Sequence, residues 1–536
     1  MAKIFYPDFF NDILGPVMQP GSSTSFAGNS RVGHAASFTV KGPLKSVKIR
    51  FFSEGQFRRL GNMMEDRAFL GGLQGFWTDD ERLFQAHELA REKGISYEFG
   101  VLDHDNSHDK AVRFDLEDHQ GIKGSLIGSS VGGGMIEVLE INGFPILWRG
   151  DTHGVLIIRD SSSQPKIDAF IAAQGDAVVE NNIFKNAVGR EASFIELSAL
   201  PTESLLEKSL ADTNWRLFQA LLPVVTFKGR KPQLFRTVDE WIAYAKDKGI
   251  SFVQAAIEYE KAFSGWDDAK IWDYFKKLRE ILFHQIHALE DRGTYPVADT
   301  PLLPVYGKFW KTYKDAGKSL QDPLTSRIMD YAFSTNAKIP GVKIVPGPMG
   351  TGGGYLFSAL EAVREARGLS VEKQIEGLAI AAGLGAIAYS NCHCSGASGC
   401  VGESGMCCAM GSGAVTWMAG GTGEQVQWAA SMALQANIGI PCDPIPGGLE
   451  FPCLTRTVRS AVTAPLYADM ALAGIDPLIP FHEMLTVIEH TRALYGPAVT
   501  GPGCGACGTE TAERCGRFLR EEVMEGKLKW EAEVSA

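Results

Sequence analysis

The stretch EQVQWAASMALQANIGIPCDPIPGGLEFPCLTRT, residues 424–457, decides how the C-terminal half of this chain is interpreted. Its first part, Glu424–Ile438, has helical periodicity and is closed by Gly439. Cys442 follows between a proline and an aspartate, where the backbone cannot be helical, and Cys453 follows a proline directly before a second helical segment. The stretch therefore predicts two helices joined by a loop, rich in glycine and proline, that carries two cysteines.

A third cysteine, Cys400, lies in a similar setting, the glycine-rich turn GASGCVGESG before a helical segment. A thiolate at a helix N-terminus is favoured by the helix dipole and by free N–H groups. Three thiolates can hold an iron–sulfur cluster with one iron left open, and such an iron can act as a Lewis acid. This pattern indicates a catalyst of elimination or hydration. The alternative for any single cysteine is a small buried apolar side chain.

The remaining cysteines also lie close to these three, since all ten in the chain come after residue 391. Those near Cys400 are interpreted as buried packing residues or as packing around the site: Cys392, Cys394, Cys407 and Cys408. Near the C-terminus, Cys504 and Cys507 form one CxxC pair, which is a weak zinc signal without a partner pair, and Cys515 has no assigned role.

Bulk properties exclude several classes of function. The chain has 536 residues, a net charge of −11 and a pI near 5.6, which disfavours nucleic acid and anionic membranes as partners. No apolar run reaches the ~18 residues of a membrane helix, and the N-terminus has no signal-peptide pattern. We therefore expect a cytoplasmic protein whose cysteines are thiols or metal ligands.

The order of helix and strand signals predicts a multidomain protein. Residues 1–142 alternate helical and strand patterns, as in an α/β (α+β) domain. Residues 143–225 read as a small α+β module of β-α-β-β order followed by a helical stretch, Ser204–Leu222. Residues 232–536 are dominated by helical periodicity with long glycine-rich interruptions, which predicts a large all-α catalytic domain.

Several of these segments resemble the iron–sulfur-dependent L-serine dehydratases. The α part of that family is matched by residues 421–480, by IVPGPMGTGGGYLFSAL (344–360) and by SNCHCSGASGCVGESG (390–405). The β part is matched by QPGSSTSFAGNSRVG (19–33), EDRAFLGGLQGFWTDDER (65–82) and SSVGGGMIEVLEINGFPI (129–146). The unit after Asn142 resembles the ACT-type module of some members. The resemblance implies the order β part, ACT-like module, α part.

The resemblance implies a cofactor and a reaction. The cysteine spacings of 42 and 11 residues fit the family's triad, so Cys400, Cys442 and Cys453 are expected to ligate a [4Fe–4S] cluster. The implied reaction is β-elimination without pyridoxal phosphate. From a small β-hydroxy amino acid it gives a keto acid and ammonia, and a related hydroxy acid is the other substrate class that the resemblance leaves open. A cytoplasmic homodimer is expected.

Further site residues are assigned on the same ground. The hydroxyl run before a helix, which can cradle a carboxylate or merely cap the helix, consists of Ser22, Ser23, Thr24 and Ser25. Arg456 can pair with the same carboxylate or be a solvated helix residue. Polar positions of the family's cluster loop are matched by Asn391, Ser395 and Glu403. The two histidine candidates are His108, which matches a family histidine that could handle protons, and His393, between two cysteines, which has no family counterpart.

Two departures from the family pattern concern the substrate. Ser25 occupies the position of a family histidine, and Met63 that of a second one. A pocket that lost two imidazoles is not expected to bind the same substrate unchanged. Three hypotheses follow: a hydro-lyase or ammonia-lyase acting on L-serine or a relative, a carbon–sulfur lyase using the same cluster on cysteine, and a non-catalytic iron–sulfur sensor.

Overall fold

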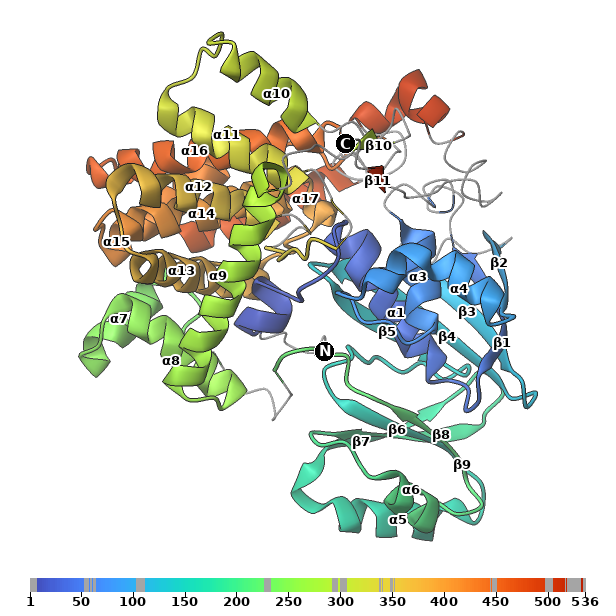
Figure 1. Cartoon of the computed structure of the whole chain (residues 1–536). Coiled ribbons are helices and arrows are strands. Elements are labelled where there is room, and N and C mark those ends of the chain that lie inside the picture. The colour runs from blue at the N-terminus through green and yellow to red at the C-terminus, as the bar shows by residue number, and fades with distance from the viewer. Residues whose placement is uncertain are drawn as a thin grey trace.

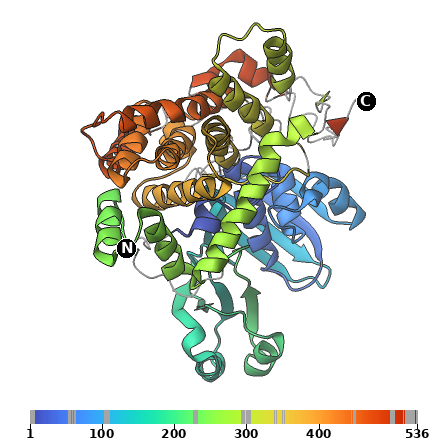
Figure 2. The ribbon, with the colours of Figure 1, turned by 60° about the vertical axis from the view of Figure 1, so that its left-hand side comes forward.

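The chain folds into three groups of elements that follow each other in sequence (Figure 1). An α/β unit comes first, a small four-stranded unit second, and a large helical region last. In both views the small unit projects away from the helical region (Figure 2). The computed structural model describes residues 7–52, 57, 60, 64–102, 111–225, 233–291, 297–298, 306–336, 339, 341–347, 350, 352–443, 445, 451–496, 505–515, 517 and 532–533.

The α/β unit is built on a five-stranded sheet of order β2-β1-β3-β4-β5, in which only β1 and β2 are parallel. Its strands are β1 (Leu44–Phe51), β2 (Ser96–Val101), β3 (Ala111–Asp118), β4 (Lys123–Gly132) and β5 (Met135–Ile141). Helices α1 (Asn29–Ser37), α3 (Glu65–Leu73) and α4 (Ala86–Glu92) cover one face (Figure 1). The expected α/β class of this unit is confirmed.

Close packing of α1 on α3 depends on glycine. A Cβ on Gly33 would lie 2.5 Å from the carbonyl oxygen of Phe69, and one on Gly72 would overlap the carbonyl of Ser30. The two helix backbones therefore touch. This contact fixes α1, and with it the serine run that directly precedes α1, relative to the sheet.

The small unit has the order β-α-β-β-α-β and an antiparallel sheet of order β7-β8-β6-β9, a split β-α-β arrangement. Its elements are β6 (His153–Ile158), α5 (Ser163–Gln174), β7 (Val178–Lys185), β8 (Glu191–Leu197), α6 (Glu203–Ser209) and β9 (Asn214–Phe218). The helix expected over Ser204–Leu222 is wrong beyond α6. Asp212 adopts a left-handed φ of 59° that ends the helix, and burial then alternates along β9.

The two faces of the small sheet have different partners. Val155 and Ile157 pack with the side chains of α5 and α6. Leu156 and Phe194, on the opposite face, belong to the core of the α/β unit together with Trp148. Alternation along β6 and β8 thus joins the two units through one continuous core.

The helical region contains α7 (Val238–Lys248), α8 (Phe252–Ser264), α9 (Asp268–Asp291), α10 (Tyr306–Asp315), α11 (Pro323–Asn336), α12 (Gly352–Arg367), α13 (Val371–Asn391), α14 (Ser404–Met418), α15 (Gly423–Gln435), α16 (Cys453–Leu472) and α17 (Phe481–Tyr495). A short strand pair, β10 (Val297–Ala298) with β11 (Ala532–Glu533), is added to it. Almost every residue of α14 is buried, so this helix lies inside the region. The expected helical class is confirmed. No helix of the described residues is long and apolar enough to cross a membrane.

The N-terminal segment belongs to the core of the helical region rather than to the sheet. Phe9, Phe10 and Ile13 are fully buried there. The backbone N–H of Phe9 donates to Glu260 Oε2 at 2.8 Å. The chain therefore starts inside the helical region before it enters the α/β unit, which ties these two parts together.

Candidate active site

Two of the three cysteines stand at the start of helical turns, and all three lie along two neighbouring loops. Cys400 begins a short 3-10 turn, Cys453 begins α16, and Cys442 lies in the connection after α15. The backbone N–H of Cys400 donates to the carbonyl of Ile440 at 2.8 Å, which joins the two loops. Cys400 and Cys453 are buried, whereas Cys442 is partly exposed. Cys400 and Cys453 therefore have the helix-start settings that the sequence predicts, whereas Cys442 lies in the loop after α15, which ends at Gln435 rather than at the expected Ile438.

Arg456 connects these cysteines. It lies one turn into α16, and its Nη1 donates to the carbonyl of Pro441 at 2.6 Å and to Asp443 Oδ1 at 2.5 Å. Burial raises the pKa of the Cys400 thiol, and the charge of Arg456 opposes that effect. The pKa of Arg456 is raised despite its burial, first by Asp443 and then by Cys400 and Cys453. One guanidinium thus acts on both loops.

Asp443 is a site residue that the sequence analysis did not single out. Its side chain is 3% exposed, and besides Arg456 it accepts a hydrogen bond from the backbone N–H of Ala506 at 2.8 Å. It therefore holds the C-terminal segment that contains Cys507 against the cysteine loops. Its position directly after Cys442, between two prolines, is the signal that could have found it.

Glu403 brings a carboxylate to the same loops. Its Oε2 lies 4.0 Å from the Sγ of Cys442, and its charge raises the pKa of Cys400. The Oγ of Ser404 lies 2.8 Å from the Sγ of Cys400. The structure therefore places Glu403 with the cysteines, as expected for a polar residue of the cluster loop.

Ser395 lies where the α/β unit contacts the cysteine loops. Its Oγ accepts a hydrogen bond from the backbone N–H of Ala397 at 3.2 Å, and its Cβ contacts Gly132 in the β4–β5 turn so closely that no side chain fits there. A Cβ on the neighbouring Gly396 would lie 2.6 Å from the Sγ of Cys442. Glycine at residue 396 therefore leaves the space that this sulfur occupies.

A segment that includes Gly347 and Gly350 lies between the serine run and the start of α14, next to the cysteine loops. Ser22 Oγ accepts a hydrogen bond from the N–H of Ser25 at 3.1 Å and caps the π-helical turn Ser23–Gly28, which also contains Thr24. A Cβ on Gly350 would lie 2.7 Å from the backbone nitrogen of Ser23. On the other side of this segment, the Sγ of Cys407 donates to the carbonyl of Gly347 at 2.7 Å.

Cys407 also connects this segment to Glu403. The backbone N–H of Cys407 donates to the carbonyl of Glu403 at 3.0 Å, one turn along α14. The serine run, Gly350, Gly347 and the start of α14 are therefore linked by contacts that lead to the cysteine loops. The capping role of Ser22, held open as an alternative, is observed; the neighbouring hydroxyls of Thr24 and Ser25 are partly exposed.

Asn391 and His393 are not brought to the three cysteines. The Nδ2 of Asn391 donates to the carbonyl of Ile387 at 2.7 Å, and the Nδ1 of His393 lies 3.0 Å from Glu489 Oε1. Both line a separate cavity of about 380 Å³ whose lining includes Arg31 but none of the three cysteines. His108, Met63 and Cys504 lie outside the described residues.

The arrangement of the three cysteine thiols suits an iron–sulfur cluster better than a single metal ion. Among the residues that the structure describes, no three His, Cys, Asp or Glu side chains converge as the ligands of a single metal ion would. Ligands of an inorganic cluster surround several irons and are spread more widely. Three thiols at two joined loops, a guanidinium that favours thiolate and a glycine that leaves room at Cys442 fit such a cluster.

Comparison with known proteins also indicates similarity to the L-serine dehydratases. The family model of the serine dehydratase alpha chain matches residues 247–496. The chain is 28% identical over 294 residues to the L-serine dehydratase alpha chain of Peptoniphilus asaccharolyticus, covering 54% of this chain and 99% of the relative. It is 30% identical over 305 residues to the probable L-serine dehydratase alpha chain of Bacillus subtilis (strain 168), covering 55% of this chain and 97% of the relative.

The beta chains of the same enzymes are also similar to this chain. The probable L-serine dehydratase beta chain of Bacillus subtilis (strain 168) is 34% identical over 149 residues, which is 28% of this chain and 67% of the relative. Fold, cysteine loops and these similarities define an enzyme of the lyase class. The chain belongs to the iron–sulfur L-serine dehydratase family and joins counterparts of the beta and alpha chains in one polypeptide.

Proposed function

We propose that this enzyme catalyses β-elimination from L-serine or a related β-substituted amino or hydroxy acid, with a [4Fe–4S] cluster held by Cys400, Cys442 and Cys453. The observation that carries the proposal is the link through Arg456, which lies one turn after Cys453, bonds both neighbours of Cys442 and acts on the charge of Cys400. When bound, the cluster supplies a Lewis acid for the leaving group. No pyridoxal phosphate is required.

The chain's own residues bind and orient the substrate in this proposal. The turn Ser23–Gly28 offers hydroxyls and backbone N–H groups to a carboxylate, and Gly350 lies against its backbone. Glu403 is the carboxylate at the cysteine loops, and we assign to it removal of the Cα proton. Because Arg456 is already bonded to Asp443, its proposed role moves from binding substrate to holding the loops in place.

The small unit is proposed to be an ACT-like module. Its β-α-β-β-α-β order and antiparallel sheet support this assignment. Strand β7 is an edge strand with Val179 42% exposed and Ile183 53% exposed, which suits pairing with a second copy in the expected homodimer. Cysteines that serve as thiols or cluster ligands suit the cytoplasm, which is the proposed location.

The substrate is the open part of the proposal, because Ser25 stands where the family has a histidine. We would incubate the anaerobically purified enzyme with β-hydroxy and β-thio amino acids and measure keto acid, ammonia and sulfide. Keto acid and ammonia without sulfide, from L-serine or a β-hydroxy relative, support the proposal. Sulfide release from cysteine would assign a carbon–sulfur lyase, and ligand binding without any product would assign a sensor.

A further inference from the structure

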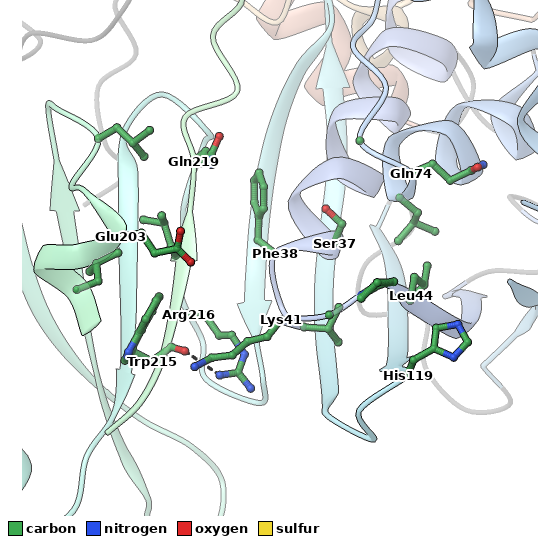
Figure 3. A pocket seen from close by; sticks show the side chains of 18 of the residues that line it. Ser37, Phe38, Lys41, Leu44, Gln74, His119, Glu203, Trp215, Arg216 and Gln219 are labelled. Carbon is green, nitrogen blue, oxygen red and sulfur yellow. Dashed lines mark hydrogen bonds between the residues drawn. The ribbon is translucent and has the colours of Figure 1, made fainter. Parts of the chain in front are cut away.

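A second cavity, of about 1160 Å³, lies between the α/β unit and the small unit (Figure 3). One wall is formed by the loop after α1, the end of α3 and the β3–β4 turn, and the other by the start of α6 and by β9. Its lining includes none of the three cysteines and none of the serine run. It is therefore separate from the candidate active site, and the proposed reaction leaves it unused.

Two cations lie side by side in this cavity, Lys41 from the loop after α1 and Arg216 from β9 (Figure 3). Arg216 is 9% exposed, and its side chain donates only to neutral oxygens: the carbonyl of Thr39 at 3.0 Å, the side chain of Asn214 at 3.0 Å and the carbonyl of Trp215 at 2.7 Å. Among the described residues, neither cation forms an ion pair. A buried cation without a carboxylate is costly.

Among the described residues, the nearby carboxylates form no ion pair with these two cations, although the charge of Asp118 partly offsets the effect of burial on the pKa of Arg216. Asp118 accepts hydrogen bonds from four backbone N–H groups, those of Lys41, Gly42, Gln120 and Ile122. Glu203 and Glu207 are exposed on α6. The pKa of Lys41 is lowered by burial and by the charge of Arg216, and only partly restored by Glu207. An oxyanion placed between the two cations would remove their repulsion.

Apolar surface lies next to the cations. Phe38 and Trp215 line the cavity on opposite sides, and the Nζ of Lys41 lies 4.5 Å from the centre of the Trp215 ring (Figure 3). Leu206, fully buried, adds to this lining. A ligand that fits both features carries a carboxylate and a flat or branched apolar body.

We propose that this cavity binds a small organic acid, with its carboxylate between Lys41 and Arg216 and its apolar body against Phe38 and Trp215. The site lies at the end of α1, and the serine run lies just before the start of that helix. The ligand therefore binds at the joint of two units, away from the residues assigned to the substrate. The inference does not depend on the proposed reaction.

The test is calorimetric titration of the full-length protein with benzoate, acetate and inorganic phosphate at constant ionic strength. We expect one saturable benzoate site per chain and weaker binding of acetate and phosphate. Lys41→Gln, at an exposed side chain, should weaken benzoate at least about tenfold, since it removes a charge-assisted contact. Lys45→Gln is the matched control, because Lys45 pairs with Glu117 outside the cavity and should leave benzoate affinity unchanged.

A second variant separates the two parts of the proposed ligand. Trp215→Leu keeps both cations and should weaken benzoate more than acetate, because only benzoate has a ring to pack there. The proposal is overturned by the absence of saturable benzoate binding, by equal affinity in Lys41→Gln, or by phosphate binding more tightly than benzoate. Neither iron content nor turnover enters these readouts, so failure here is distinguishable from failure of the proposed function.

Discussion

At the scale of single residues, Gly396 leaves the space beside the Sγ of Cys442 that a side chain at this position would occupy. Gly396→Ala would place a Cβ 2.6 Å from the Sγ of Cys442, so the loop must move and we expect loss of most bound iron. Gly411→Ala on α14 is the control, because its Cβ would meet neighbours only at 3.4 Å or more. Iron and sulfide content of the anaerobically purified variants is the measurement. Equal iron in both variants would contradict this account of residue 396.

A second residue prediction concerns the buried carboxyl of Glu260. Burial, reinforced by Asp8, raises its pKa well above the ordinary value, which favours the protonated carboxyl in the folded protein. An unfolded glutamate ionises above about pH 4.3, so this contribution to stability is complete below that pH and declines as pH rises. The melting temperature of Glu260→Gln should therefore fall less than that of the wild type as the pH is raised from 5 to 8. Glu258→Gln, on the same helix, should behave like the wild type in that scan.

The local settings of Cys400 and Cys453 follow from the sequence, whereas the contacts around them do not. Cys400 and Cys453 could be placed at helix starts because glycine and proline mark those boundaries in the sequence. The separation of His393 from the cysteines could not, because it depends on a tertiary contact with Glu489 on α17. The pairing of Arg456 with Asp443 is likewise a contact between loops that no local pattern encodes.

At the scale of elements, α3 is anchored to α4 by a buried hydrogen bond between Asp66 and His87. Asp66 is fully buried, and its Oδ2 lies 2.5 Å from His87 Nε2. Burial opposes ionisation, but the hydrogen bond from His87 and the charge of Arg67 outweigh it and lower the pKa of Asp66 to about 2. Stability from this pair is present above about pH 4 and lost as pH falls toward 2.

Asp66→Asn should therefore destabilise the α/β unit by about 3 kcal/mol near pH 7, because it leaves a buried polar group poorly paired. Thermal denaturation followed by circular dichroism measures the change, and the difference from the wild type should shrink at low pH. Asp80→Asn, which removes a carboxylate paired with the exposed Arg82, should cost less than about 1 kcal/mol. Equal losses in the two variants would show that the buried pair does not anchor α3.

Elements with strong periodicity were predicted well, and those that depend on partners were not. The bounds of α7 follow from local sequence, because the side chain of Thr237 caps its start and Gly249, in a left-handed conformation, ends it. β4, KGSLIGSSVG, gives little hydrophobic signal because most of its residues are small, and its pairing with β3 and β5 makes it a strand. β9 lies within the stretch that the sequence predicts as a helix, Ser204–Leu222, and its pairing with β6 makes it a strand.

At the scale of the whole molecule, the N-terminal segment joins the helical region to the α/β unit. Phe10 is fully buried, and its ring lies 4.5 Å from that of Tyr274 and 5.1 Å from that of Phe275. Phe10→Ala should destabilise the helical region by about 3–5 kcal/mol. Phe309→Ala is the control, because Phe309 is 67% exposed. Melting curves of both variants test the prediction, and an unchanged midpoint in Phe10→Ala would exclude a structural role for this segment.

The candidate active site depends on how the α/β unit and the helical region are placed relative to each other. Gly350 contacts the serine run and Gly347 contacts Cys407 on α14, so the candidate active site lies where the beta and alpha counterparts meet. The division of the chain near residues 142 and 225 stays a prediction. A fused polypeptide keeps the two halves of such a site at high effective concentration, which separate chains must achieve by association.

The central claim is that three cysteines of this chain hold one iron–sulfur cluster. The most direct measurement is the iron, acid-labile sulfide and zinc content of the anaerobically purified protein, compared between wild type and Cys442→Ser. We predict about four irons and four sulfides per chain in the wild type, little of either in Cys442→Ser, and no stoichiometric zinc. Zinc alone in the wild type, or an unchanged iron content in Cys442→Ser, would contradict the account.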